Sequence, residues 1–431
     1  MEYKKFLELL DKEMVVTLGC TEPIAIAFAA ALAKKHVKGD ELSSVRVLAS
    51  ANVIKNAMSV VIPGTQGSGI DLAAALGVLA GDFTKGLEVL TGLTSRDVEK
   101  AKRMIENQIV TVELADTSKK LYIEVVVSTP QSYAKVVVAD EHTKVVLIEV
   151  DGKTIINTLT EDETTYGCEG GEVSFLTIDS IWEFVQRVKT SDLTIIKKAI
   201  ELNTNIALEG LAQTYGLQVG KTIKKGVGKG FLRDDLVTHA MALTASASDA
   251  RMAGCLMPVM SNSGSGNQGI SATLPIVDVG EKLHVSDELL IRAVTLSNLI
   301  AIYIKTKIAR LSALCGATAS GTGASCGITF LLGGGREEIK SAIQNMQGNV
   351  TGMFCDGAKA GCAMKLSTCT SAAVQSAMMA VEGIVIQETD GIIESNAEKT
   401  IENLGRLANQ GTREVDRIVL DIMIHKKLSM R

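Results

Sequence analysis

IVTVELADTSKKLYIEVVVSTPQSYAKVVVADEHTKVVLIEV, residues 109–150, is the stretch that decides the fold class. It holds four short runs rich in β-branched residues, 109–114, 121–127, 134–138 and 145–150. Polar turns separate these runs, and this pattern predicts an antiparallel meander. The turns at 116–118 and 140–142 carry no obvious catalytic pattern, so His142 is expected to be a solvated turn residue.

Helical periodicity surrounds this stretch on both sides. Before it, the pattern predicts helices at 2–14, about 24–36, from near Ile70, and at 97–107, with a strand at 45–51. After Ile178 it is helical almost to the end, at 179–189, 192–214, 234–251, 286–310, 318–332, 336–346, 357–388 and 396–425. We therefore expect an α+β fold, with an N-terminal α/β portion carrying an antiparallel sheet (1–175) and a mostly helical C-terminal domain (176–431). Residues 158–175 are expected to form a surface loop at the junction.

Composition restricts the classes of function. The chain of 431 residues is 46% hydrophobic and has a formal net charge of −5, so it lacks the basic footprint of a nucleic-acid-binding protein. No uncharged apolar run reaches the roughly 18 residues that a membrane span needs. The N-terminus shows no signal-peptide core with a cleavage site. These features predict a soluble cytoplasmic protein with no membrane partner.

The cysteines suggest a metal centre. Disulfides are not expected in a cytosolic chain. Cys355 and Cys362 lie seven positions apart beside glycines, and Leu314-Cys315-Gly316 opens another glycine-rich run upstream. Three thiolates from two turns can hold three irons of a cubane cluster, which leaves the fourth iron open as a Lewis acid. Zinc is the rival metal, but structural zinc sites usually have short C-x₂₋₄-C pairs, so the spacing favours a cluster.

The remaining cysteines are of two kinds. Cys168, Cys255 and Cys326 are expected to be small buried residues, and Cys369 is expected to lie in the core of a helix. Cys20 stands just before a predicted helix N-terminus, where the macrodipole lowers a thiol pKa. The functional interpretation is a reactive thiol, and the alternative is a buried structural cysteine.

Two glycine-rich loops offer backbone N–H groups and hydroxyls. Residues 62–69 precede a helix and could seat a carboxylate or phosphate, or could be an ordinary turn. Residues 260–269 contain G-x-G-x-x-G, but they lie inside the helical half and not in a βαβ unit, so a dinucleotide site is rejected. This loop suits the carboxylate of a small substrate, and the alternative is a flexible connection.

The combined motifs resemble the L-cysteine desulfidase family, which is related to the alpha chain of iron–sulfur L-serine dehydratases. The resemblance runs almost end to end and rests on Gly19-Cys20-Thr21-Glu22-Pro23, Val53-Ile54-Lys55-Asn56-Ala57 with Ile62-Pro63-Gly64-Thr65, Ser261–Gly269, Leu314-Cys315-Gly316, and Cys355-Asp356-Gly357-Ala358-Lys359 with Gly361-Cys362. It departs from the serine dehydratases in having no cysteine near its C-terminus, which favours the desulfidase branch.

The resemblance implies one oxygen-sensitive 4Fe-4S cluster per chain, held by Cys315, Cys355 and Cys362. It implies that Cys20 is the fourth ligand at rest, the catalytic base, or both. The reaction would convert L-cysteine to pyruvate, ammonia and sulfide. The expected substrate-binding residues, with Asn52 and Lys55 as secondary candidates, are Asn52, Lys55, Thr65, Gly67, Ser68, Ser261, Asn262, Ser263, Gly264 and Asn267.

Two other functions remain open at this point. An L-serine dehydratase would use the same residues on serine. A non-catalytic iron–sulfur or redox sensor would hold a cluster without turnover, although the sequence shows no partner-binding or DNA-binding module. The hydrophobic helical half also leads us to expect a homodimer.

Overall fold

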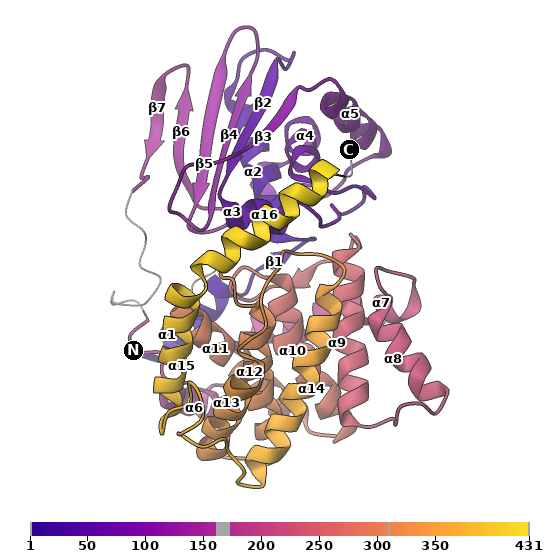
Figure 1. Cartoon of the computed structure of the whole chain (residues 1–431), viewed down its shortest axis with the longest axis vertical. Coiled ribbons are helices and arrows are strands. Elements are labelled where there is room, and N and C mark those ends of the chain that lie inside the picture. The colour runs from indigo at the N-terminus through magenta and orange to yellow at the C-terminus, as the bar shows by residue number, and fades with distance from the viewer. Residues whose placement is uncertain (1, 161–172, 309–310, 430–431) are drawn as a thin grey trace.

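The computed structural model describes residues 2–160, 173–308 and 311–429, and Cys168 lies outside them. A sheet with its covering helices forms one part of the molecule, and a bundle of helices forms the other (Figure 1). The predicted α+β class is confirmed.

A six-stranded sheet dominates the first part. Its order is β3-β2-β4-β5-β6-β7, and the strands are β2 (Ser44–Ala49), β3 (Val110–Leu114), β4 (Tyr122–Ser128), β5 (Tyr133–Ala139), β6 (Val145–Val150) and β7 (Lys153–Asn157). The prediction of four consecutive antiparallel strands is wrong for the first run. β2 lies between β3 and β4, and β3 pairs with it in parallel. β7 was not predicted, because all its residues are exposed and no buried face marks it.

Two helices, α2 (Thr21–His36) and α4 (Ile70–Ala80), pack against this sheet. The helix α3 (Ala51–Ala57) and the 3₁₀ turn η1 (Phe83–Glu88) pack on α2, and α5 (Ser95–Glu106) packs on α4. β4 alternates half-buried and buried residues, so one face of the sheet supplies the core. α2 is buried along most of its length. A Cβ on Gly77 would lie 2.4 Å from the Ala27 carbonyl oxygen, so only glycine allows α4 to approach α2 this closely.

The second part is a bundle in which α12 packs against several neighbours. Its elements are α6 (Ile178–Arg187), α7 (Thr194–Ala212), α8 (Val219–Gly228), α9 (Leu236–Met252), α10 (Gly266–Lys282), α11 (Asp287–Ile308), α12 (Gly316–Leu331), α13 (Arg336–Val350), α14 (Cys362–Val381), α15 (Ala397–Arg406) and the π-helical turn η2 (Leu407–Gly411). The sequence pattern missed α8 and α10. Pro275 argues against a helix, yet α10 carries it because most of this helix is enclosed by its neighbours.

The two ends of the chain each pack on the distant part. α1 (Glu2–Glu13) places Phe6 and Leu10 in the core of the bundle. The next residues form β1 (Val16–Thr17), which pairs with β8 (Val259–Met260). In return, α16 (Arg413–Ser429) runs from the bundle to the sheet part and puts Leu420 into that core (Figure 1). The two parts are therefore joined by both ends of the chain.

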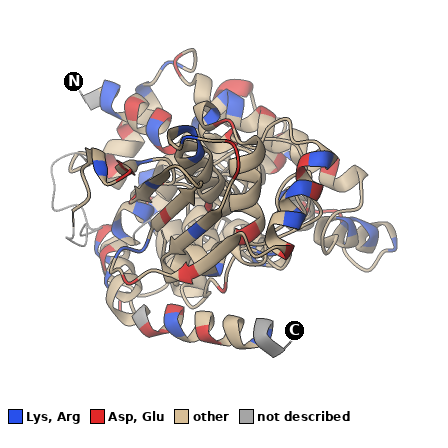
Figure 2. Ribbon diagram, turned by 90° about the horizontal axis from the view of Figure 1, so that it is seen from above, with Lys and Arg blue, Asp and Glu red and all other residues tan. Residues whose placement is uncertain are grey.

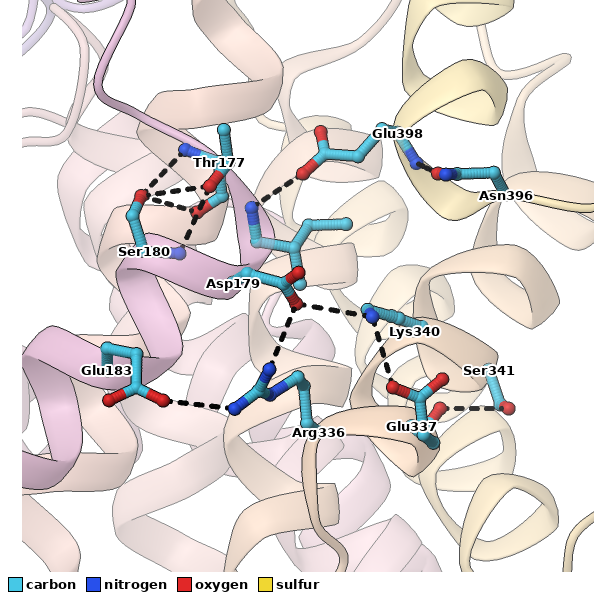
Figure 3. Close-up of polar contacts among 11 residues, drawn as sticks. Thr177, Asp179, Ser180, Glu183, Arg336, Glu337, Lys340, Ser341, Asn396 and Glu398 are labelled. Carbon is cyan, nitrogen blue, oxygen red and sulfur yellow. Dashed lines mark hydrogen bonds and ion pairs between the residues drawn. The ribbon is translucent and has the colours of Figure 1, made fainter.

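Polar contacts fix the place where the chain enters the bundle at α6 (Figure 3). Thr177 caps this helix through the Ser180 N–H. The Ile178 N–H donates to the Glu398 carboxylate of α15 at 2.7 Å. Arg336 of α13 lies 3.0 Å from Glu183 in the same view. The start of α6 is thus tied to two helices that follow it by more than 150 residues.

Charges of both signs alternate along the outer helices in Figure 2, apart from the lysine-rich α8. α11 is the one described helix that is long and apolar enough to cross a membrane, by length and composition. Of its apolar window, 72% is buried inside the protein. A core helix of a soluble protein has the same character, and the packing of α11 in the bundle agrees with that interpretation.

The packing of α1 predicts a stability effect. Leu10 is fully buried, so Leu10→Ala is expected to lower the free energy of unfolding by about 2–5 kcal/mol in urea denaturation. Leu208→Ala is the control, because Leu208 is 55% exposed and its loss should change stability by about 0.5 kcal/mol or less. Equal effects of the two substitutions would contradict the placement of α1 in the core.

Candidate functional site

Cys315 and Cys355 lie side by side although they are distant in the sequence. An antiparallel bridge pairs Leu314 with Phe354. The Cys355 N–H donates to the Ala313 carbonyl at 2.7 Å. Backbone pairing therefore sets the relative position of two of the three predicted cluster ligands.

Cys362 begins α14, and the turn before it is held by Asp356. The Asp356 carboxylate accepts hydrogen bonds from Lys359 and, at 2.5 Å, from Lys365. Burial raises the pKa of Asp356, but the hydrogen bonds and charges of the two lysines have the larger effect and lower it to about 2. Lys365 also donates to the Phe354 carbonyl at 2.6 Å, so these lysines hold the turn between Cys355 and Cys362 in place.

The three thiols are near enough for their charges to interact. Burial raises the pKa of Cys315, and the charges of Cys355, Cys369 and Cys362 raise it further. Burial also raises the pKa of Cys362, with a smaller contribution from Cys355. Like charges at short range oppose ionisation, so a bound cation is needed to hold these sulfurs together as thiolates.

Exposure separates the predicted ligands from the other cysteines. Cys315, Cys355 and Cys362 are half-buried. The other described cysteines are buried: Cys20, Cys255, Cys326 and Cys369. The core positions expected for Cys255, Cys326 and Cys369 are confirmed. Three accessible thiols at one place are what a cluster-binding site needs.

Cys20 lies beside this group although it comes from the first part of the molecule. It forms a small apolar cluster with Val60 and Met252, against which Ala358 and Cys362 pack. The prediction of a lowered thiol pKa is wrong. Burial raises the pKa of Cys20 and the charge of Glu22 adds to this effect, and together they outweigh the electropositive helix N-terminus.

Glu22 is the immediate polar partner of Cys20. The Cys20 thiol donates to Glu22 Oε2 at 3.2 Å, and the Asn56 amide donates to Oε1 at 3.0 Å. Burial raises the pKa of Glu22, but contacts with His142 and Cys20 lower it, to about 2. His142 Nε2 lies 3.8 Å from Oε1. His142 is buried, so its prediction as a solvated turn residue is wrong: the turn between β5 and β6 folds inward onto α2.

Arg251, like Glu22, is a site residue to which the sequence analysis gave no role. It is buried near the end of α9, and its Nη2 donates to the Gly19 carbonyl at 2.8 Å. Its positive charge acts on the thiols of both Cys20 and Cys362. A signal was present: Asp249 and Arg251 are the only Asp, Glu, Lys or Arg residues of α9, which otherwise consists mainly of small and apolar residues. A charge in such a helix is expected to be buried for a reason.

Asn52 and Lys55 face the C-terminal helix. Lys55 Nζ lies 2.5 Å from the Asp416 carboxylate and donates to the Cys355 carbonyl at 3.2 Å. The Asn52 amide, oriented to satisfy its hydrogen bonds, donates to the same carboxylate at 3.1 and 3.2 Å. In this structure the two side chains hold α16 and the Cys355 segment against α3.

The loop around Thr65 closes on itself. Thr65 Oγ1 donates to the Ile62 carbonyl at 2.8 Å and accepts from the Gly67 N–H at 3.0 Å. Ser68 is exposed at its end. A Cβ on Gly19 would lie 2.4 Å from Pro63, so the start of this loop presses directly on the segment that carries Cys20.

The loop from Ser261 to Asn267 also adjoins Cys20. The side chains of Ser261, Asn262 and Ser263 are bonded to other groups of the protein. The Gly264 carbonyl accepts from Thr21 Oγ1 at 2.9 Å, which joins this loop to the start of α2. Asn267 is half-buried and accepts from Ser248 at 3.3 Å. The roles predicted for these residues in substrate binding stay predictions.

Four helices begin around the thiols. Cys20 and Cys315 are the N-caps of α2 and α12, and Cys362 is the first residue of α14. α10 begins at Gly266, next to the loop that contacts α2. Helix N-termini present unpaired N–H groups and favour negative charge. Their convergence favours an anionic group at this place.

These residues fit a cluster better than a single ion. Within 2–160, 173–308 and 311–429, no three His, Cys, Asp or Glu side chains gather closely enough to bind one metal ion. A structural zinc site would need such a set. In a 4Fe-4S cluster each thiolate binds its own iron. Three half-buried thiols, two of them at helix N-termini, are the donors that such a cluster would use.

A cavity of about 610 Å³ lies elsewhere, between α7, α10 and the start of α11. Glu201, Glu281 and His284 are among the residues that line it. It shares none of the cysteines or loop residues described above. The cysteines and the two glycine-rich loops therefore lie away from this cavity.

Comparison with known proteins identifies the family. Residues 84–421 match the model of the serine dehydratase alpha chain family. The chain is 47% identical over 426 residues to a UPF0597 protein of Oleidesulfovibrio alaskensis, with 99% of both chains covered. UPF0597 proteins of Shewanella halifaxensis and Clostridium perfringens are 45% and 44% identical, with 98% of both chains covered in each case. The predicted relationship to the serine dehydratase alpha chain is confirmed, and this chain belongs to that family.

Proposed function

We propose that this protein is a lyase that removes the β-substituent of an L-amino acid, with L-cysteine as its substrate and pyruvate, ammonia and sulfide as products. The observation that carries the proposal is the packing of Cys362 against the small cluster of Cys20, Val60 and Met252, which brings a proton-carrying thiol near the three half-buried cysteines. The fit of Cys315, Cys355 and Cys362 to a 4Fe-4S cluster supports their assignment as its ligands. When bound, such a cluster would supply a Lewis-acidic iron beside Cys20.

The residues of the chain provide the proton chemistry. Burial and Glu22 favour the thiol form of Cys20, which can give a proton to the departing sulfur. The positive charge of Arg251 and of a bound cluster's iron would favour the thiolate, whose Sγ can take the α-proton of the substrate. Glu22 accepts the hydrogen bond from this thiol at 3.2 Å and so fixes its direction. Asn56 and His142 hold Glu22 from the other side. The apolar contacts of Val60 and Met252 limit the access of water to Cys20.

One part of the surroundings of Cys20 favours a thiol over a hydroxyl substrate. Beside the charged Glu22 and Arg251, the neighbouring groups are Val60, Met252, Ala358 and Cys362, which are apolar or contain sulfur. A hydroxyl that loses water without gaining a hydrogen bond is destabilised, whereas a thiol behaves as a small hydrophobic group. L-serine dehydration is the second candidate, and the family match itself favours it.

The cluster assignment predicts a pattern among cysteine variants. Anaerobic reconstitution should give about four irons and four sulfides per chain, with visible absorption. Cys315→Ala, Cys355→Ala and Cys362→Ala should each lose most of this iron. Cys326→Ala is the control. This variant should keep its iron, because Cys326 of α12 is fully buried in the hydrophobic core. A wild-type chain that binds no iron would refute the assignment.

The substrate assignment predicts preferential release of sulfide. Under anaerobic conditions the reconstituted protein should form equal amounts of pyruvate and sulfide from L-cysteine, with a higher kcat/KM than for L-serine. A higher kcat/KM for L-serine would establish the dehydratase alternative. A full cluster content with no turnover of either amino acid would favour the sensor alternative.

The role of Cys20 predicts a separation between cluster binding and turnover. Cys20→Ala should keep most of the iron and lower kcat by about 10²–10⁴-fold, the usual contribution of a positioned acid–base group. Glu22→Gln keeps an acceptor oxygen and should lower kcat less than Cys20→Ala does. Turnover at the wild-type rate in Cys20→Ala would remove this residue from the mechanism.

A further inference from the structure

Arg251 is a buried cation with an incomplete set of partners. It is 3% exposed, and its one hydrogen bond within the described residues goes from Nη2 to the Gly19 carbonyl. Its Nε is buried and has no hydrogen-bond partner. No carboxylate in the described part of the chain forms an ion pair with it.

A buried arginine that forms no ion pair requires an anionic partner. A guanidinium cannot deprotonate in a protein, so burial does not neutralise it. Burying a charge without a counter-charge is strongly unfavourable, and native proteins pair such groups. The missing counter-charge is therefore expected to arrive with a ligand.

The guanidinium points at the start of α10. A Cβ on Gly266 would lie 2.3 Å from Arg251 Nε, so the absence of a side chain there makes room for the guanidinium. Gly266 is the first residue of α10, whose N-cap is Ser265. The positive end of this helix thus lies directly beside the positive side chain. Both favour one small anion.

The position of Arg251 relative to the thiols indicates which kind of anion it binds. Arg251 acts on Cys20 and Cys362, whereas the charge of Cys315 and Cys355 acts on Lys365. Lys365 is thus the cation placed beside the paired ligands, and Arg251 stands on the side of Cys20. The free Nε belongs to a planar fork that matches a carboxylate, which accepts two parallel hydrogen bonds.

We propose that Arg251 binds the α-carboxylate of the substrate amino acid, together with the N-terminal N–H groups of α10. This inference rests on the proposed function, because it takes an amino acid as the ligand of the site. Arg251 then fixes the end of the substrate that does not react, and the β-substituent extends toward the cysteines. The protein accordingly selects amino acids over the amines that lack the carboxylate.

The test measures binding and does not depend on turnover. L-alanine has no leaving group, and ethylamine is the same molecule without its carboxylate. Calorimetry on the reconstituted wild type should show that L-alanine binds more tightly than ethylamine. Arg251→Gln should weaken L-alanine binding by at least about 30-fold, as expected when one partner of a buried charge pair is removed. Ethylamine binding and the iron content should be unchanged.

Two further variants keep the test decisive. Arg251→Lys retains the charge but not the fork, so it should fold and bind L-alanine with an intermediate affinity. Arg292→Gln is the matched control: Arg292 is a mostly buried arginine on α11 that pairs with Glu288, and its loss should leave L-alanine binding unchanged.

Several results would overturn the assignment. They are a wild type that does not bind L-alanine, an Arg251→Gln variant that binds it normally, an equal loss of ethylamine binding, or a loss of iron in that variant. The last would show that the guanidinium serves the cluster. Failure of the proposed function gives a different result, in which L-alanine binding depends on Arg251 but neither L-cysteine nor L-serine is converted.

Discussion

The packing of the Cys355–Cys362 segment against the cluster of Cys20, Val60 and Met252 is the constraint on which the candidate site depends. Two glycines make it possible. Gly19, at φ +77°, lets its segment press on Pro63, and a Cβ on Gly357, at φ +94°, would lie 2.5 Å from the Lys55 carbonyl oxygen. The first lets two segments of the sheet part approach each other beside Cys20, and the second lets the cysteine loop of the bundle approach α3 of the sheet part. The site therefore exists only where the two parts of the molecule meet.

The exchange of chain ends stabilises this contact. α1 contributes to the core of the bundle, and α16 contributes Leu420 to the core of the sheet part. Asp416 of α16 pairs with the buried Lys55, which also holds the Cys355 carbonyl. Separation of the parts would leave this lysine without its partner, and an unpaired buried charge is costly. The C-terminal helix thus helps to hold the cysteine loop in place.

Two buried residues of opposite charge, Glu22 and Arg251, lie near the Cys20 thiol. Glu22 is the acceptor for the Cys20 thiol, and Arg251 lies on the same side with a free Nε. These two residues form no ion pair with each other in the described structure. Because these two opposite charges are not paired with each other, each of them can interact with a different group. Stability alone would favour their pairing, so the arrangement is better explained by ligand binding.

The fold class and most helices could be predicted from the sequence, because periodicity is a local signal. Glycine-flanked thiols also singled out Cys315, Cys355 and Cys362, whose role as cluster ligands stays a prediction. The order of β3 and β2 could not be predicted, since strand pairing depends on contacts far apart in the chain. Arg251, Glu22 and His142 were missed or misjudged for the same reason. A histidine in a polar turn has the pattern of a solvated residue, and only the packing of that turn on α2 reveals its contact with Glu22. The pKa of Cys20 was misjudged because the helix dipole is visible in sequence, whereas burial is not.

The central claim is that an iron–sulfur cluster lies between three cysteines of the bundle and faces Cys20 from the other part of the molecule. A crystal structure of the anaerobically reconstituted protein, with an anomalous-difference map at the iron edge, tests it most directly. We expect one compact iron peak bordered by Cys315, Cys355 and Cys362, with Cys20 on its remaining side. Iron bound at Cys255, Cys326 or Cys369, or a peak remote from Cys20, would contradict it.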